Sequence, residues 1–300
     1  MQHTAFIHTN HKQMVGALVS RYSLKRNSPN ADKFDIRFID TADHDFLRAR
    51  DGQYYLRDGA RRLWLYDDLQ SFTPLRFMPP ELMGYQGRAV VIDPDIFAAG
   101  DVWELLTRDM GEAAFLCRPR SGSKGRRGCM ASSVMLLDCS KLAHWRCEEQ
   151  FNEMFAFKRD YMEWISLKLE PEGAIGLFEY EWNDFDHLTP RTKLVHNTKR
   201  KTQPWKTGLK VDYFAPEKPG GSAVIGSLYR MRRRLFGHYA FMGHYQPHPD
   251  PNQEHFFFGL LRECLEQGIV TEDMVREEMR QTHVRQDALA VLDRTPPLAA

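Results

Sequence analysis

The sequence predicts an α/β fold in which a mixed sheet is flanked by helices and followed by a helical C-terminal subdomain. The chain opens as strand, amphipathic helix and strand, which is the usual start of a parallel α/β sheet. Two later apolar strands each end at an acidic residue, and beyond residue 219 only helical patterns remain. The segments that support this prediction are 4–9, 11–25, 34–39, 89–92, 133–138 and 219–300.

The N-terminal helix is predicted over residues 11–25 because Met14, Ala17, Leu18 and Tyr22 recur at helical spacing. A run of turn-forming residues, 27–30, ends it. Residues 41–70 are charged and aromatic, and their pattern fits no single element. Gly52 and Gly59 favour a turn-rich segment, and we expect a small hairpin at the rim of the sheet.

Asp93-Pro94-Asp95 ends the apolar strand 89–92. Proline has no N–H to give a sheet, so a central strand must stop there or become an edge. Two carboxylates at the end of a buried strand are costly to desolvate, and a hard divalent cation is their natural partner. The alternative is a strand-ending turn, because Asp and Pro are common turn residues. Asp101 can cap a helix over 102–107.

The middle of the chain alternates strands and helices. Residues 119–128 form a basic, Gly/Ser-rich loop, read either as a solvated surface loop or as a lid over an anionic ligand. The other elements that we expect here are strands at 112–118, 175–178 and 193–196 and helices at 139–155 and 160–169. The expected C-terminal helices are 224–236, 252–267, 271–281 and 284–293, with Gly237 and Gly268 as stops.

Composition limits the class of protein. The 300 residues carry a net charge of +1, which gives no global attraction to nucleic acid. The five cysteines lack metal-site or disulfide spacing, and the N-terminus lacks the features of a signal peptide. We therefore expect a cytoplasmic protein with reduced cysteines. The basic segment Arg230–Arg234 reads as a solvated helix face or as a peripheral contact with the anionic inner face of a membrane.

Several strings together resemble glycosyltransferase family 8, the glycogenin and lipopolysaccharide galactosyltransferase group with a GT-A fold. The resemblance covers residues 4–206, and the shared order of the strings is more specific than any one of them. These strings are HTNHKQMVGALVSRYSLKRN from His8, FTPLRFMPPEL from Phe72, RAVVIDPDIFAAGDVWEL from Arg88, ASSVMLLDCSKL from Ala131, the pair Trp182-Asn183, and Val195-His196 followed by Pro204-Trp205.

The resemblance implies that residues 1–218 form a Rossmann-like, nucleotide-diphospho-sugar-binding catalytic domain, with residues 219–300 as the helical subdomain. It implies that Asp93, Asp95 and His196 bind Mn²⁺ or Mg²⁺ on the diphosphate of a UDP-sugar. Residues near Thr9 and Asn10 would line the nucleoside pocket. Arg76 would lie near the donor phosphates or sugar.

Three departures from the family pattern concern the site. The lysine expected before Pro-Trp is Gln203, so that Lys199, Lys201 or Lys206 would take over phosphate contact. Trp205 fits a lid residue or a core aromatic equally well. Ala131 and Ser133 replace the family's Asn and Gly, and Ser133 can narrow the sugar site. For the family's sugar-site Asp-Gln pair the nearest candidates are Asp160 and Glu163, which can also form a solvated helix face.

The function that follows is a metal-dependent glycosyltransferase that moves a hexose from a UDP-sugar to a hydroxyl of a glycan or lipid-linked acceptor. The family implies retention of configuration, and no clear nucleophile is evident. A nucleotidyltransferase is less favoured, because residues 8–15 lack a glycine-rich basic stretch for a triphosphate. A non-catalytic nucleotide-sugar or glycan-binding protein is the remaining alternative, which Gln203 and Ala131 keep open.

Overall fold

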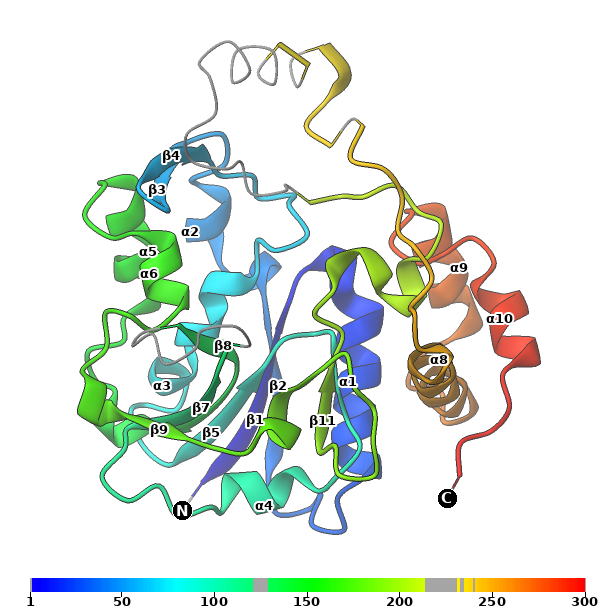
Figure 1. Ribbon diagram of the computed structural model, residues 1–300, viewed down its shortest axis with the longest axis horizontal. Coiled ribbons are helices and arrows are strands. Elements are labelled where there is room, and N and C mark those ends of the chain that lie inside the picture. The colour runs from blue at the N-terminus through cyan, green and yellow to red at the C-terminus, as the bar shows by residue number, and fades with distance from the viewer. Residues whose placement is uncertain (1, 121–128, 214–230, 233–234, 240, 300) are drawn as a thin grey trace.

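A six-stranded mixed sheet lies at the centre of the computed structural model (Figure 1). The structure describes residues 2–120, 129–213, 231–232, 235–239 and 241–299. The strand order is β2-β1-β5-β8-β7-β9, and β8 runs antiparallel to both of its neighbours. The predicted α/β class is therefore confirmed. The strands are β1 (His3–Thr9), β2 (Asp35–Asp40), β5 (Arg88–Ile92), β7 (Phe115–Pro119), β8 (Met130–Asp138) and β9 (Ile175–Leu177).

Both faces of the sheet are buried, because neighbouring residues of the central strands pack into different apolar clusters. Phe6 of β1 belongs to the cluster on one face, and Ala5 and Ile7 belong to the cluster on the other. This alternation follows from the two-residue period of a strand. Helices α5 (Cys147–Phe155) and α6 (Tyr161–Ile165) contribute to the first cluster, and α4 (Val102–Leu106) contributes to the second.

The N-terminal strand–helix–strand unit is confirmed. Helix α1 (Met14–Arg26) connects β1 to β2, and the side chain of Asn10 accepts a hydrogen bond from the Lys12 N–H in the 3-10 turn that precedes the helix. The predicted rim hairpin is also present, as β3 (Tyr54–Arg57) and β4 (Ala60–Leu63). Its turn places Asp58 and Gly59 at positive φ, a conformation that glycine adopts without strain.

A second, three-stranded sheet is the feature that the sequence did not reveal. It joins β10 (Asp184–Phe185), β11 (Leu194–His196) and β6 (Ile96–Ala98). Strand β11 runs antiparallel to β6, and His196 pairs with Ile96. The predicted strand 193–196 is thus confirmed. Its partner is the segment that follows the two aspartates, and this pairing brings His196 to them.

Three helix predictions are wrong in extent. The predicted helix 284–293 begins only at Ala288. Within 139–155, a 3-10 turn occupies Cys139–Lys141 and α5 begins at Cys147, because the Asp138 carboxylate accepts from the Ser140 N–H and closes a separate turn. Within 160–169, α6 ends at Ile165, and Leu167 turns the chain at φ 60° with its side chain buried. Two further short α-helices in the described part of the chain are α2 (Asp45–Arg48) and α3 (Pro79–Leu82).

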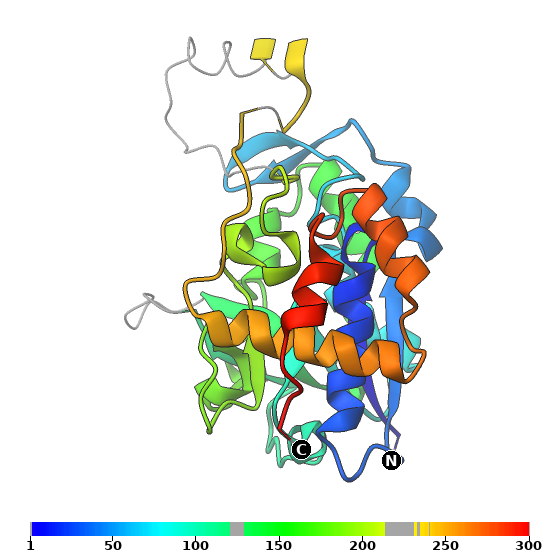
Figure 2. The same ribbon diagram turned by 90° about the vertical axis from the view of Figure 1, so that its right-hand side faces the viewer.

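The C-terminal helices are α8 (Pro251–Glu266), α9 (Glu272–Arg280) and α10 (Ala288–Arg294) (Figure 2). Helix α8 packs against α1, and α10 packs against α8 and α9. Their apolar side chains form one cluster with Val15 and Leu18 of α1, Phe97 of β6, Val195 of β11 and Trp205. The proposed boundary near residue 218 and nearly all of the predicted helix 224–236 lie outside the described residues, as do residues 121–128 of the predicted 119–128 loop. No helix in the described ranges has the length and apolar character needed to cross a bilayer.

Candidate metal and nucleotide-sugar site

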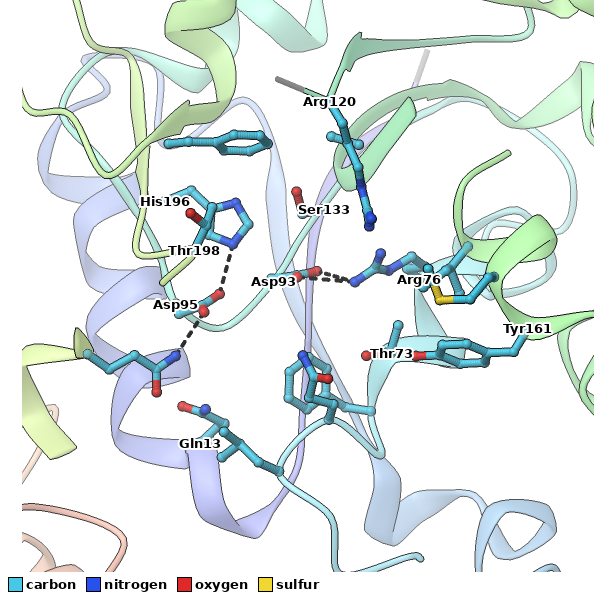
Figure 3. Close-up of a pocket in the computed structure, with 18 of the residues that line it drawn as sticks. Gln13, Thr73, Arg76, Asp93, Asp95, Arg120, Ser133, Tyr161, His196 and Thr198 are labelled. Carbon is cyan, nitrogen blue, oxygen red and sulfur yellow. Dashed lines mark hydrogen bonds and ion pairs between the residues drawn. The ribbon is translucent and has the colours of Figure 1, made fainter. Parts of the chain in front are cut away.

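Asp93, Asp95 and His196 converge at one side of a cavity (Figure 3). One ligand atom from each lies within 4.8 Å of the other two. Asp93 follows β5, Asp95 precedes β6, and His196 ends β11, so two sheets meet at this point. The backbone N–H of Asn197 donates to the Asp95 carbonyl at 3.2 Å, which fixes the register of the two segments.

The tautomer of His196 is set by Asn183. The Asn183 amide donates to the hydroxyl of Ser133 at 3.0 Å, so its carbonyl oxygen faces His196 Nδ1 at 2.9 Å. A carbonyl oxygen can only accept, so Nδ1 must carry the proton. In its neutral form the ring therefore presents the lone pair of Nε2 on its other side.

That lone pair faces a carboxylate. His196 Nε2 lies 3.4 Å from Asp95 Oδ1, and Oδ1 is buried with no hydrogen-bond donor among the described residues. The other oxygen, Oδ2, accepts from the Gln203 amide at 2.9 Å. Two acceptor atoms in this position need a cation or a proton between them. The donor set of two carboxylates and an imidazole fits Mn²⁺ or Mg²⁺.

Asp93 is held in its charged form by two neighbours. Arg76 donates to both carboxylate oxygens, at 2.8 and 3.1 Å, and His8 Nε2 lies 2.8 Å from Oδ1. Burial alone would raise the pKa of Asp93, but the charge of Arg76 and the contact with His8 hold that pKa well below its usual value. Burial lowers the pKa of His8, against the opposing pull of Asp93.

The cavity beside these residues has a volume of about 330 Å³, which is at the lower end for small-molecule sites. In Figure 3 the aspartates and His196 lie on one side, and Arg76, Arg120 and Tyr161 lie on the other. Ser133, which the sequence marked as a departure, also lines the cavity. A polar, strongly charged lining of this kind suits a charged and hydroxylated ligand.

Thr9 and Asn10 are buried, and they support the cavity indirectly by hydrogen bonding to the segment that lines it. The Asn10 amide donates to the carbonyls of Asp68 and Leu69 and to the hydroxyl of Ser71. Thr9 donates to the Asn10 carbonyl. Leu69 lines the cavity, whereas Thr9 and Asn10 themselves are not among the described lining residues. They hold the wall that a ligand would contact.

The basic segment 199–206 divides into separate roles. Of its described side chains, Gln203 is the one that lines the cavity. Lys199 is exposed, and Lys201 donates to the Met242 carbonyl at 3.1 Å. The side chain of Lys206 is fully buried, and its Nζ forms an ion pair with Asp212 Oδ2 at 3.0 Å. Trp205 is 1% exposed and stacks on Phe257 of α8, which is the position of a core aromatic.

Asp160 and Glu163 lie away from the metal-ligand cluster. Asp160 caps α6 by accepting from the backbone N–H groups of Met162 and Glu163, and it also accepts from Gly59. Both acids border a different hollow, next to Lys158 and Arg159. Among the described residues of α6, it is Tyr161, Met162 and Ile165 that line the main cavity. The structure thus gives Asp160 a helix-capping contact rather than a position beside the metal ligands.

Sequence reasoning did not assign roles to Asn183, His8 or Gln13. Asn183 orients the imidazole, His8 supports Asp93, and Gln13 lines the cavity with a buried carbonyl oxygen that has no donor among the described residues. The Trp182-Asn183 pair was a signal for the first of these. For His8 the signal was the sheet order, because Ile7 pairs with Ile92 and so brings His8 beside Asp93.

No family model matches the chain, and no curated protein matches it. Among solved structures it is similar to the galactosyltransferase LgtC in complex with donor and acceptor sugar analogs, with 13% identity, a TM-score of 0.47, and coverage of 67% of this chain and 89% of LgtC. It is also similar to the apo-form glycosyltransferase GlyE of Streptococcus pneumoniae TIGR4, with 14% identity, a TM-score of 0.48, and coverage of 68% of this chain and 56% of GlyE. A third similar structure is the bifunctional glycosyltransferase WbbM, with 12% identity, a TM-score of 0.48, and coverage of 69% of this chain and 47% of WbbM. At these identities and TM-scores the similarity assigns no activity to this chain, and its own residues carry the functional proposal.

Proposed function

We propose that this protein is a metal-dependent glycosyltransferase of the GT-A type, similar to family 8, which transfers a hexose from a UDP-sugar to an acceptor hydroxyl. One observation carries the proposal. Asp95 Oδ1 lies 3.4 Å from His196 Nε2 and has no hydrogen-bond donor among the described residues, and Asp93 lies beside them. These three side chains can together act as ligands to one divalent cation.

A bound divalent cation supplies Lewis-acid stabilisation of the departing nucleoside diphosphate. Asp93, Asp95 and His196 would hold it. Gln203 keeps one Asp95 oxygen engaged so that the other is directed at the ion, and Arg76 fixes the Asp93 carboxylate. These contacts pre-organise the ligands before substrate arrives, which lowers the reorganisation that the reaction requires.

Retention of configuration is part of the proposal. Asp93 and Asp95 are the carboxylates among the described residues that line the cavity, and both are assigned to the cation. Among the described lining residues no other side chain is a carboxylate that could act as the nucleophile. We therefore infer a same-face displacement, in which the leaving phosphate assists the incoming hydroxyl. The acceptor would be a glycan or a lipid-linked sugar.

A non-catalytic nucleotide-sugar-binding protein is the second candidate. The observation that favours it is the placement of Asp160 and Glu163, the expected sugar-site acids, outside the main cavity. Such a protein would bind Mn²⁺ and UDP-sugar in the same way and would release no product.

Isothermal titration of UDP with and without Mn²⁺ tests the shared part of both candidates. We expect UDP binding that requires Mn²⁺, disappears in Asp95→Ala and survives in Asp43→Ala, an exposed acid that serves as the matched control. UDP binding that is indifferent to Mn²⁺ and to Asp95→Ala would refute the proposal. Release of UDP from UDP-glucose or UDP-galactose over hours then separates an enzyme from a binding protein.

A further inference from the structure

A second hollow lies on the side of helix α6 that faces away from the main cavity. Tyr161, Met162 and Ile165 line the main cavity, whereas Glu163 borders the second hollow. A helix turns by about 100° per residue, so Glu163 points roughly opposite to Tyr161 and Ile165. The hollow has a volume of about 280 Å³, just below the range of about 300–1,000 Å³ that is usual for small-molecule sites. Its size therefore suits a single small ring.

One buried polar atom in this hollow lacks a partner. The Gln150 side chain is 7% exposed and lines the hollow. Its NH₂ group donates to the His144 carbonyl at 3.1 Å, which fixes the orientation of the amide and leaves Oε1 as an acceptor. Oε1 is buried, and no donor for it lies within the described part of the chain. Such an acceptor calls for a donor from outside the chain, which a ligand hydroxyl can supply.

Three charged side chains of the same hollow keep hydrogen-bonding capacity for a ligand. Arg159 donates through Nε to Glu153 at 2.7 Å, and its two terminal nitrogens have no acceptor among the residues that the structure describes. Lys158 and Glu163 are exposed, and neither side chain pairs with another described group. The hollow thus offers donors from Lys158 and Arg159 and acceptors from Gln150 and Glu163.

The mixture of charges indicates a neutral ligand. Lys158 and Arg159 stand beside three carboxylates, those of Asp160, Glu163 and Glu170. An anion would meet the carboxylates, and a simple cation would meet the lysine and the arginine. A neutral molecule with several hydroxyls avoids both conflicts, because each hydroxyl can donate one hydrogen bond and accept others. A sugar ring is a small ring of this chemistry.

We propose that this hollow binds one neutral pyranose ring, as a carbohydrate subsite separate from the main cavity. Ring hydroxyls donate to Gln150 Oε1 and to the Glu163 carboxylate, and they accept from Lys158 and Arg159. The subsite depends on its own residues and not on the metal ligands. For the proposed transfer, such a ring is a unit of the acceptor glycan remote from the reacting hydroxyl, and that assignment alone rests on the proposed function.

Saturation-transfer NMR with methyl β-galactoside and methyl α-glucoside measures the binding of neutral rings. We expect saturable binding of at least one glycoside at millimolar concentrations, with the same affinity in Asp95→Ala protein because the subsite uses no metal ligand. Inorganic phosphate and methylammonium are the charged probes. We expect neither of them to displace the glycoside.

Three variants locate the binding. Gln150→Leu should weaken it by about tenfold, because it removes the buried acceptor. Lys158→Ala and Glu163→Ala should each weaken it by about threefold or more, and both change exposed side chains, so the fold is preserved. The matched controls are Lys168→Ala and Glu149→Ala, which alter exposed residues that are not among the described lining residues. Circular dichroism checks folding, and the two exposed variants decide the matter if Gln150→Leu does not fold.

Three outcomes would overturn the inference. They are the absence of saturable glycoside binding, glycoside binding that is lost in Asp95→Ala and kept in Lys158→Ala and Glu163→Ala, and displacement of the glycoside by phosphate or methylammonium. The first means that Gln150 Oε1 is satisfied by water, the second assigns the glycoside to the main cavity, and the third makes the hollow an ion site. Absence of Mn²⁺-dependent UDP binding would instead refute the proposed function and leave the subsite unaffected.

Discussion

Lys206 provides the sharpest test of the structural assignments. The sequence offered it, together with Lys199 and Lys201, as a contact for the donor phosphates, and the structure buries it in an ion pair with Asp212. Its side chain is completely buried, and Nζ lies 3.0 Å from Asp212 Oδ2. The Tyr245 hydroxyl donates to the other Asp212 oxygen at 2.6 Å. Burial lowers the pKa of Lys206, and Asp212 opposes that shift. Removing either partner should therefore lower stability without changing UDP affinity.

The two single variants should differ in magnitude. Asp212→Asn leaves a fully buried ammonium without its counter-charge, and the lysine can escape this only by losing its proton. Deprotonating a lysine of pKa about 10.4 costs roughly 4.6 kcal/mol at pH 7, and this cost is the upper limit for the loss of unfolding free energy in Asp212→Asn. Lys206→Met removes the buried charge, and Asp212 keeps 19% exposure and the Tyr245 bond. We expect a loss of about 3 kcal/mol, at the low end for a broken buried pair.

Urea unfolding followed by tryptophan fluorescence at pH 7 measures these losses. The double variant Lys206→Met/Asp212→Asn should recover part of the stability, because no uncompensated charge remains buried. In Asp212→Asn the pKa of Lys206 lies below that of the unfolded chain, so the unfolded state binds more protons. The stability of that variant should rise with pH, by up to about 1.4 kcal/mol per unit below pH 10.

The reasoning would be refuted by a Lys206→Met protein that is as stable as the wild type and has lost its affinity for Mn²⁺–UDP. That result would mean that Lys206 contacts phosphate, as one of the three lysines offered in place of Gln203. Reduced stability together with unchanged UDP affinity would assign it to the ion pair.

Three further substitutions test other parts of the structure. Trp205→Ala should lower the unfolding free energy by about 3–5 kcal/mol, because the ring is almost fully buried against α8, and a loss below 1 kcal/mol in urea would contradict its core placement. Arg76→Met should cost more stability at pH 7 than at pH 3. The lowered pKa of Asp93 gives a stabilisation that is present above about pH 4 and lost as pH falls; equal losses at the two pH values, measured by circular dichroism, would count against that ion pair. Gly16→Ala should lower stability by about 1–2 kcal/mol despite the better helix propensity of alanine, because the new Cβ would lie 2.8 Å from the backbone oxygen of the proline between the two aspartates. Gly173→Ala, where a Cβ meets open space, is its control and should be neutral.

Local patterns predicted most of the fold. The strand–helix–strand opening, the rim hairpin, the strands that end at Asp93 and Asp138, and the helix α8 followed by Gly268 each depend on neighbours in sequence. Helix lengths were predicted less well. The 139–155 segment has a continuous helical pattern of apolar residues, but an aspartate that caps its first turn separates it into two pieces. Side-chain caps compete with the helix, and spacing alone does not reveal which one prevails.

The candidate site was predicted in part. The two aspartates follow from a strand that ends in acids, and His196 followed from the family resemblance. The partners that orient these ligands were not predicted. Asn183, His8 and Gln203 reach them through the register of separate strands and turns, and no local pattern records which strands pair.

The sequence by itself determined where strands and helices form, which faces are apolar and where two carboxylates emerge from a buried strand, because these features depend on side-chain periodicity and turn chemistry within a few residues. Only the tertiary structure decided which polar groups meet. The pairing of β11 with β6 brings His196 to Asp95, burial assigns Lys206 to Asp212, and the rim hairpin carries Arg57 into the cavity. His196 and Asp95 are about a hundred residues apart in sequence, whereas Lys206 and Asp212 are only six apart. In both cases the packing of the surrounding chain, and not the local sequence pattern, selects the partner.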